Sequence, residues 1–326
     1  MLLNVLEYHW VEDIDDALVL LSRTDTKTVA LAGGTYLLGL DDESIQALVD
    51  LRDLDLAYIR EDAKGAHIGA MTTLQAMADS PVLKNLADGL LARAAQASTP
   101  SRLVRESATL GGTLAIGAAS QADMLTALAA LDAEALVRSG SKSQFDLGAG
   151  SLDRPGLALS GVTFRGKQER RLPTFNLNQQ RRANELILEV VVPPLSSGAG
   201  ASFQRVGRTQ NDMALLNAAA IVEVVDGNFA QARLALGGVN MEPVRLRGVE
   251  QQLVGQAAMN PGGDTLNTQS IVAALQEGMT EFQPPPDMRA SSSYRRSAGL
   301  NLAFRTLEEA VAISRWRGVV SSKERQ

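Results

Sequence analysis

The stretch Ala32-Gly33-Gly34-Thr35-Tyr36-Leu37-Leu38 follows the short apolar run Thr28-Val29-Ala30-Leu31, and this order is typical of a strand that ends in a glycine turn. Two adjacent glycines carry no β-carbons, so the backbone can adopt positive φ and aim several N–H groups at one point, where a phosphate or pyrophosphate fits. The hydroxyl of Thr35 adds one more donor. A single Gly-Gly pair is more often an ordinary turn, so this interpretation needs a second observation.

The second observation is a copy of the pattern. Thr109-Leu110-Gly111-Gly112-Thr113 again places two glycines and a threonine beside short apolar segments. We call residues 32–38 the first glycine motif and residues 109–113 the second glycine motif. Neither has the Gly-Lys-Ser/Thr ending of a Walker loop or the Gly-x-Gly-x-x-Gly spacing of a Rossmann turn. The pair predicts two loops that hold one diphosphate from both sides, in a phosphorylated cofactor bound by some other fold.

Composition limits the classes of function. The chain has 326 residues, 45% of them hydrophobic, which is long enough for two domains with real cores. Its formal net charge is −6 and it has no basic block, so we expect no nucleic-acid partner. It has no cysteine, which excludes disulfides, thiolate catalysis and an iron–sulfur cluster ligated by this chain. The two histidines, His9 and His67, lie apart from any carboxylate at ligand spacing, so we expect no metal site and a structural position for His67.

The order of apolar runs predicts an α+β chain. Near the N-terminus we expect a helix with Asp13 to Asp16 in its first turn, because acidic residues there suit the helix dipole. Further helices are expected over 83–97 and after Asp123, hairpin turns around 144–147, and a strand over 185–192. Strands around 203–239 and a final helix over 294–316 form a C-terminal part. We place the boundary near residue 175, with domains 1–175 and 176–326.

No basic region followed by a long apolar one stands at the N-terminus, and no apolar run is long enough to span a membrane. We therefore expect a cytoplasmic protein without a membrane partner.

The chain resembles the FAD-binding (medium) subunits of the molybdenum hydroxylases, a group that includes carbon monoxide dehydrogenase and xanthine dehydrogenase. The similar segments cover nearly the whole chain and come in the family's order: AGGTYLL at 32–38, LVDLRDL at 48–54, HIGAMTTL at 67–74, VRESATLGGTLA at 104–115, DMLTALAALDA at 123–133, ELILEVVVP at 185–193, FQRVGRTQNDMAL at 203–215, ARLALGGVNMEPVR at 232–245 and DMRASSSYRR at 287–296. The resemblance implies a two-part FAD-binding domain of the vanillyl-alcohol-oxidase (PCMH) type, followed by a smaller α+β C-terminal flavoprotein domain.

The resemblance also implies which residues contact FAD. Its pyrophosphate would lie on the two glycine motifs, with Asp123 bonded to the sugar-like chain of the flavin, although a carboxylate at a helix start is also an ordinary cap. Thr99 would lie near the isoalloxazine ring, Ile187 beside it and Gln204 near its polar edge. The full set of expected cofactor-binding residues is Ala32, Gly33, Gly34, Thr35, Tyr36, Leu37, Thr99, Thr109, Gly111, Gly112, Thr113, Asp123, Ile187 and Gln204. No catalytic residue and no metal ligand is expected in this chain.

In this family, electrons from a substrate oxidised at molybdenum pass through two iron–sulfur clusters to FAD, then to NAD or another acceptor. The resemblance therefore implies a large molybdopterin-binding subunit and a small 2Fe-2S subunit as partners, in a dimer of heterotrimers.

Two alternatives stay open. The chain departs from the family pattern at Tyr36, Gly39, Thr113 and Ala122. The departures at Tyr36, Gly39 and Ala122 motivate a flavin-free assembly subunit. A self-contained flavoprotein reductase or oxidase of the same superfamily is the other alternative, against which the C-terminal segments argue.

Overall fold

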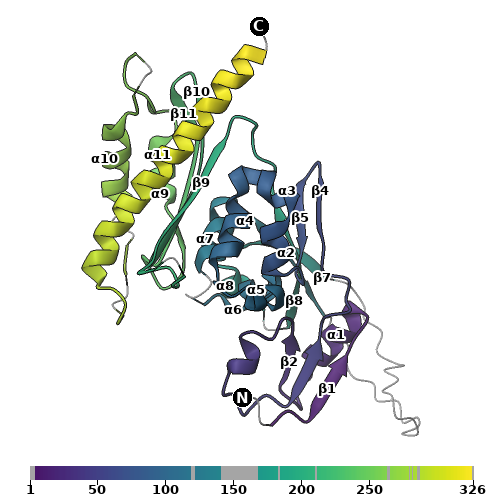
Figure 1. Ribbon diagram of the computed structural model, residues 1–326. Helices are drawn as coiled ribbons and strands as arrows, with labels where there is room; N and C mark the ends of the chain where they lie inside the picture. The colour runs from purple at the N-terminus through teal and green to yellow at the C-terminus, as the bar shows by residue number, and fades with distance from the viewer. Residues whose placement is uncertain are drawn as a thin grey trace, which may run out of the picture.

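The computed structural model describes residues 4–118, 122–140, 168–182, 184–209, 211–262, 265–278, 280, 282–284 and 287–324. It contains three sheets, each with its own helices, so the predicted α+β class is confirmed (Figure 1). Over these residues we find no helix with the length and apolar character that crossing a membrane requires. The hairpin turns predicted around 144–147 lie outside the described residues.

The first sheet is parallel, in the order β1-β3-β2, with strands β1 (Glu7–Trp10), β2 (Thr28–Leu31) and β3 (Ala47–Asp50). Helix α1 (Ile14–Leu21) connects β1 to β2 and begins as predicted, because the Asp13 side chain accepts a hydrogen bond from the backbone N–H of Asp15. The apolar side of α1 packs with β3 in one core cluster that also includes Leu186 and Leu188. This sheet therefore packs against residues from much later in the chain.

The second sheet is antiparallel, in the order β4-β5-β8-β6-β7. Its strands are β4 (Ile59–Asp62), β5 (Gly65–Gly69), β6 (Glu134–Ser139), β7 (Gln168–Pro173) and β8 (Glu185–Val192), and the last has the bounds that the sequence predicts. With it are the helices α2 (Leu74–Asp79), α3 (Pro81–Asn85), α4 (Leu90–Ala97), α5 (Arg102–Ser107), α6 (Leu110–Ile116), α7 (Ala122–Ala130) and α8 (Leu177–Gln180). The largest core cluster lies between this sheet and its helices.

The prediction of a single helix over 83–97 is wrong. These residues instead form α3 and α4, separated by the short 3-10 segment η2 (Leu86–Gly89), in which Ala87 and Asp88 have φ of 50° and 54°. The Asp88 carboxylate accepts hydrogen bonds from the backbone N–H of Ala201 (2.8 Å) and from Arg317 (2.7 Å). The break thus serves a contact with residues more than a hundred positions away, which no local pattern reveals.

The third sheet is antiparallel, in the order β12-β11-β10-β9, with strands β9 (Gly200–Val206), β10 (Leu216–Val225), β11 (Asn228–Gly237) and β12 (Val244–Arg245). Its helices are α9 (Arg247–Leu253), α10 (Thr268–Gly278) and the long α11 (Ser292–Glu324), which lies across β9 and β10 (Figure 1). These elements share a separate core cluster. Because β8 pairs with β5 and β6, we place the domain boundary between β8 and β9, and not near residue 175 as we expected from the sequence.

Helix α7 fixes the third sheet to the rest of the chain. The side-chain amide of Asn217 on β10 donates to Asp123 (2.7 Å), and the hydroxyl of Thr126 donates to the Asn217 side chain (2.7 Å). Arg245 on β12 donates to the carbonyl oxygen of Ala129 (2.9 Å). All of these groups are buried or partly buried, so the C-terminal domain is held against α7 by hydrogen bonds that water cannot easily replace.

Candidate cofactor-binding site

The first glycine motif begins where β2 ends, at Leu31, and turns against the end of α5. A β-carbon placed on Gly33 would lie 1.7 Å from the carbonyl oxygen of Ser107, so only glycine allows this approach. Gly34 has φ of +69°, in the left-handed region that favours glycine. The two glycines therefore do different things: Gly33 permits close packing and Gly34 permits the turn.

The turn leaves a row of backbone donors available. Among the described residues, the backbone N–H groups of Gly33, Gly34, Thr35 and Tyr36 have no hydrogen-bond partner. These residues are partly or fully exposed, so water satisfies the donors when no ligand is bound. Successive backbone N–H groups of this kind form a concave site for an anion.

The second glycine motif is not the loop that we predicted but the start of helix α6. Thr109 is the N-cap of that helix, and its hydroxyl oxygen accepts a hydrogen bond from the N–H of Gly112 (3.1 Å). The N–H of Gly111 donates to the carbonyl oxygen of Ala70 (2.8 Å), at the end of β5. A β-carbon on Gly111 would come within 2.8 Å of the Ala70 side chain, so this glycine allows α6 to pack on the sheet.

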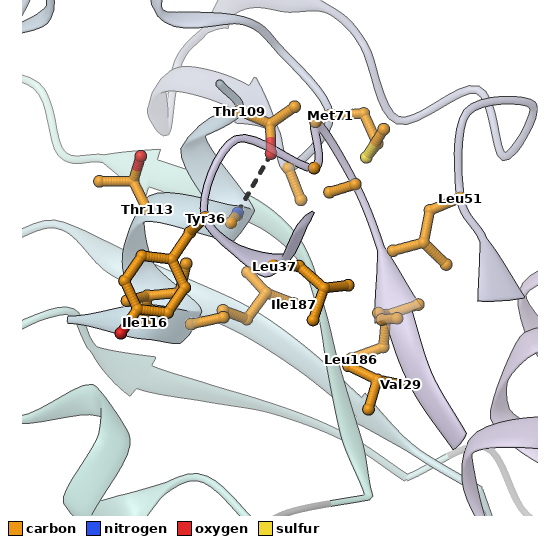
Figure 2. A pocket seen from close by; sticks show the side chains of 18 of the residues that line it. Val29, Tyr36, Leu37, Leu51, Met71, Thr109, Thr113, Ile116, Leu186 and Ile187 are labelled. Atoms are coloured by element: carbon orange, nitrogen blue, oxygen red, sulfur yellow. Dashed lines mark hydrogen bonds between the residues drawn. The ribbon is translucent and has the colours of Figure 1, made fainter. Parts of the chain in front are cut away.

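The two glycine motifs meet at one pocket of about 420 Å³ between the first and second sheets. Gly33 contacts Ser107 and Ala108, directly before the second motif, and the β-carbon of Ala32 faces Gly112. Figure 2 shows the loop of the first motif beside Thr109 and Thr113, with the side chains of Val29, Leu51, Met71, Leu186 and Ile187 filling the opposite wall. The pocket thus has a polar end formed by backbone and threonines and an apolar end formed by β2, β8 and the residues that follow β3 and β5.

Most of the expected binding residues line this pocket. They are Ala32, Gly33, Gly34, Thr35, Tyr36, Leu37, Thr109, Gly111, Gly112, Thr113 and Ile187. Tyr36, one of the departures from the family pattern, is 42% exposed, and its ring lies near Ile116 without closing the pocket (Figure 2). Gly39 is another departure, and a β-carbon added to it would have no atom within 4 Å, so this residue imposes nothing on the site.

Two charged residues that the sequence did not indicate also line the pocket. Glu185 is buried and receives two hydrogen bonds of 2.8 Å from Arg170; burial raises its pKa, but Arg170 and the backbone N–H of Arg182 together hold that pKa below its usual value. Arg181 donates to the carbonyl oxygen of Glu185 (2.9 Å), and burial lowers the pKa of its guanidinium. The pocket therefore contains one paired carboxylate and one cation.

Thr99, Asp123 and Gln204 do not line this pocket. Asp123 is buried beside Arg205, at 3.5 Å, and receives the bond from Asn217; burial raises its pKa, and these two neighbours oppose the shift. The carbonyl oxygen of Thr99 accepts a hydrogen bond from Arg105 (2.5 Å), and the amide of Gln204 donates to Glu309 (2.8 Å). Thr99 follows α4, Asp123 is on α7 and Gln204 is on β9, and both α7 and β9 contact α4; we call these three residues the junction group.

Several lining residues were missed because no local pattern marks them. Met71 and Ile116 reach the pocket from opposite ends of the long β5–α6 segment, and Arg181 from the connection between β7 and β8. The apolar run 28–31 was the one signal available in the sequence, since a strand that ends at a glycine turn places its own side chains beside that turn.

Comparison with known proteins agrees with this two-part architecture. A family model described as the FAD binding domain in molybdopterin dehydrogenase matches residues 4–149. A second, described as the CO dehydrogenase flavoprotein C-terminal domain, matches residues 201–310. Fold and site thus define a flavoprotein subunit with an FAD-binding domain and a dedicated C-terminal domain.

Individual relatives match over nearly their whole length. The chain is 27% identical to the glyceraldehyde dehydrogenase medium chain of Sulfolobus acidocaldarius, over 93% of this chain and 97% of the relative. It is 28% identical to the carbon monoxide dehydrogenase medium chain of Afipia carboxidovorans, over 94% and 96%. A solved carbon monoxide dehydrogenase from Hydrogenophaga pseudoflava shares the fold, with a TM-score of 0.79 over 96% of this chain and 99% of that one, at 24% identity.

The chain belongs to the family of FAD-binding subunits of the molybdenum hydroxylases. It is an oxidoreductase subunit, and FAD is the cofactor of its N-terminal domain. Both features of the resemblance seen in the sequence are therefore confirmed: the family and the two-part fold.

Proposed function

We propose that this chain holds FAD with its diphosphate at the two glycine motifs and passes electrons from iron–sulfur clusters on a partner to NAD or another acceptor. One observation carries the placement of FAD. The N–H groups of Gly33 to Tyr36 have no hydrogen-bond partner among the described residues, and these four residues line the pocket at the point where the first motif touches the second. A diphosphate has oxygens on two linked phosphoryl groups, so it can accept hydrogen bonds from both motifs at once.

Different groups of this chain bind different parts of the cofactor. The amides of the first motif and the hydroxyl of Thr35 donate to phosphate oxygens, while the apolar wall of Val29, Leu51 and Ile187 covers an aromatic ring system. Arg181 adds a positive charge that favours an anionic ligand. FAD itself, when bound, supplies the redox chemistry, accepting and releasing electrons.

The junction group supports a second part of this proposal. Asp123 is buried, and its carboxylate is held by Asn217 and Arg205 in one orientation. A carboxylate fixed in this way is suited to accept hydrogen bonds from the hydroxyls of a sugar-like chain. We therefore assign Asp123, Thr99 and Gln204 to the flavin end of the cofactor and the glycine motifs to its diphosphate.

The proposed partners are a large molybdopterin-binding subunit and a small 2Fe-2S subunit, assembled as a dimer of heterotrimers. The support is that two of the relatives are named medium chains, which implies other chains. In addition, this chain has no cysteine with which to ligate an iron–sulfur cluster. The substrate would then be oxidised on another chain.

Selective flavin binding tests the proposal. The purified, flavin-free chain is titrated with FAD and, separately, with FMN, which lacks the diphosphate bridge and the adenine. We expect binding of FAD at least about 100-fold tighter than that of FMN, since FMN forgoes two or more contacts with the pocket. Equal affinities would refute the placement of the diphosphate at the glycine motifs. Anaerobic addition of NADH to the FAD-loaded chain then tests the acceptor, because a chain that exchanges electrons with NAD loses its flavin absorption.

A further inference from the structure

A second cavity, of about 400 Å³, lies beside the junction group and is distinct from the pocket of the glycine motifs. It opens between α4, the start of α5 and the end of β9, where Figure 1 shows α4 next to β9. Its polar lining consists of Arg93, Arg105, Arg205, Gln96 and Asn211. We call it the arginine cavity.

The arginine cavity has three guanidinium groups in its lining and no carboxylate. Among the described residues, the Nε atom of Arg93 is buried without a hydrogen-bond partner, and no carboxylate lies within ion-pair distance of this residue. Glu309 is close enough to feel the charge of Arg93, but no hydrogen bond joins the two side chains. Arg105 donates hydrogen bonds to neutral groups, the side-chain oxygen of Gln75 (2.9 Å) and the carbonyl oxygen of Thr99 (2.5 Å). All three arginines are only partly buried, and Arg205 is ion-paired with Asp123, so among the described residues Arg93 and Arg105 are the cations of this cavity without a bonded carboxylate. Positive charge gathered around one cavity attracts anions, so this arrangement favours an anionic ligand.

The third arginine connects the cavity to the junction group. Arg205 lies 3.5 Å from the carboxylate of Asp123 and donates to the carbonyl oxygen of Asp212 (2.7 Å). Arg105 is bonded to Thr99, as described above. Two of the three residues that we assign to the flavin end are thus in direct contact with arginines of this cavity.

We propose that the arginine cavity binds the phosphoryl group of a soluble electron acceptor and so holds that acceptor beside the flavin. The inference rests on the proposed function, because it places the acceptor by reference to the junction group. Guanidinium groups bind phosphoryl oxygens through paired, charge-assisted hydrogen bonds. The cavity is large enough for a phosphate or diphosphate, and the remainder of the acceptor extends toward Thr99.

Inorganic pyrophosphate is the probe, titrated by calorimetry into the FAD-loaded chain so that the glycine motifs are already filled. We expect one site per chain, and a small shift of the flavin absorption band on binding. Arg93→Gln should weaken the affinity at least about tenfold, because it removes a charge-assisted contact. Arg93→Lys keeps the positive charge but not the planar pair of donors, so its affinity for pyrophosphate should lie between those of the wild type and Arg93→Gln.

Arg102→Gln is the matched control, because Arg102 lies on the neighbouring helix α5, is exposed and pairs with Glu106 at 2.9 Å outside the cavity. It should bind pyrophosphate like the wild type. Three results would overturn the proposal: no saturable site on the FAD-loaded chain, equal affinity in Arg93→Gln, or release of FAD by pyrophosphate, which would make the cavity part of the cofactor site. Binding without any change in the flavin spectrum would overturn its assignment to an electron acceptor.

The two proposals fail in different ways. A chain that takes up no FAD refutes the proposed function, and the comparison of wild type with Arg93→Gln in the flavin-free chain then tests the arginine cavity alone.

Discussion

Replacing Gly33 by alanine should separate the two glycine motifs. The added β-carbon would lie 1.7 Å from the carbonyl oxygen of Ser107 and 2.6 Å from its carbonyl carbon, whereas real contacts of this kind are essentially never below 3.0 Å. Both obstructing atoms belong to the backbone, so no side-chain rotation relieves the clash. The first motif must move away from α5 by more than 1 Å.

That movement has two measurable consequences. Overpacking of this size costs about 1 to 3 kcal/mol of folding stability. It also displaces the amides of the first motif from the phosphates, and losing one hydrogen bond to a charged group costs about 2 to 3 kcal/mol, or about a 30- to 150-fold weaker Kd for FAD. Quenching of flavin fluorescence gives the Kd, and thermal unfolding of the flavin-free chain gives the stability.

Gly39→Ala provides the control within the same turn. No atom lies within 4 Å of the β-carbon it would add, and Gly39 is not in the left-handed region, so both FAD affinity and stability should stay near the wild-type values. If Gly33→Ala bound FAD as tightly as Gly39→Ala, the close approach of the two motifs would not matter for the cofactor, and our reasoning would be refuted.

Three further substitutions test separate parts of the structure. Thr109→Ala removes the N-cap of α6 and should cost about 1 kcal/mol of stability, measured by urea unfolding, with a lower FAD affinity. Glu189 is buried and accepts a hydrogen bond from His67 at 2.9 Å. Burial raises the pKa of the Glu189 carboxyl, but its hydrogen bonds bring that pKa below the usual 4.5. The stabilisation from this carboxylate is therefore present above that pH and is lost as the pH falls through the folded-state pKa. Glu189→Gln should therefore be about 2 kcal/mol less stable at neutral pH, and unfolding curves recorded below about pH 4 should show the gap closing; a gap independent of pH would contradict this. Arg245→Met leaves the buried Glu250 without its ion pair and should lower the unfolding free energy by about 3 kcal/mol; a neutral effect would mean that the pair is not maintained in solution.

The sequence predicted best those elements whose signal is local. The mainly apolar run over 185–192 is buried along its whole length, its two glutamates included, and the strand has the predicted bounds. Asp13 begins α1 because its side chain accepts from a backbone N–H two residues later, a contact that any helix start with aspartate can make. His67, expected to be structural, is buried on β5 beside Glu189.

The predictions that failed depend on contacts between distant residues. Nothing near Gly111 indicates that its N–H bonds to Ala70, or that the second motif continues directly into α6. The boundary moved to the segment after β8 because this strand pairs with β5, more than a hundred residues earlier. Arg93 and Arg205 likewise meet only because α4 packs against β9.

The most direct test of the central claim is the absorption spectrum of the purified chain, recorded with and without added FAD, followed by release and identification of the flavin. We predict a flavin band at about 450 nm, one FAD per chain, and a strong loss of that band in Gly33→Ala. A colourless protein that takes up no FAD would contradict the account, and the departures at Tyr36 and Ala122 would then indicate a flavin-free subunit.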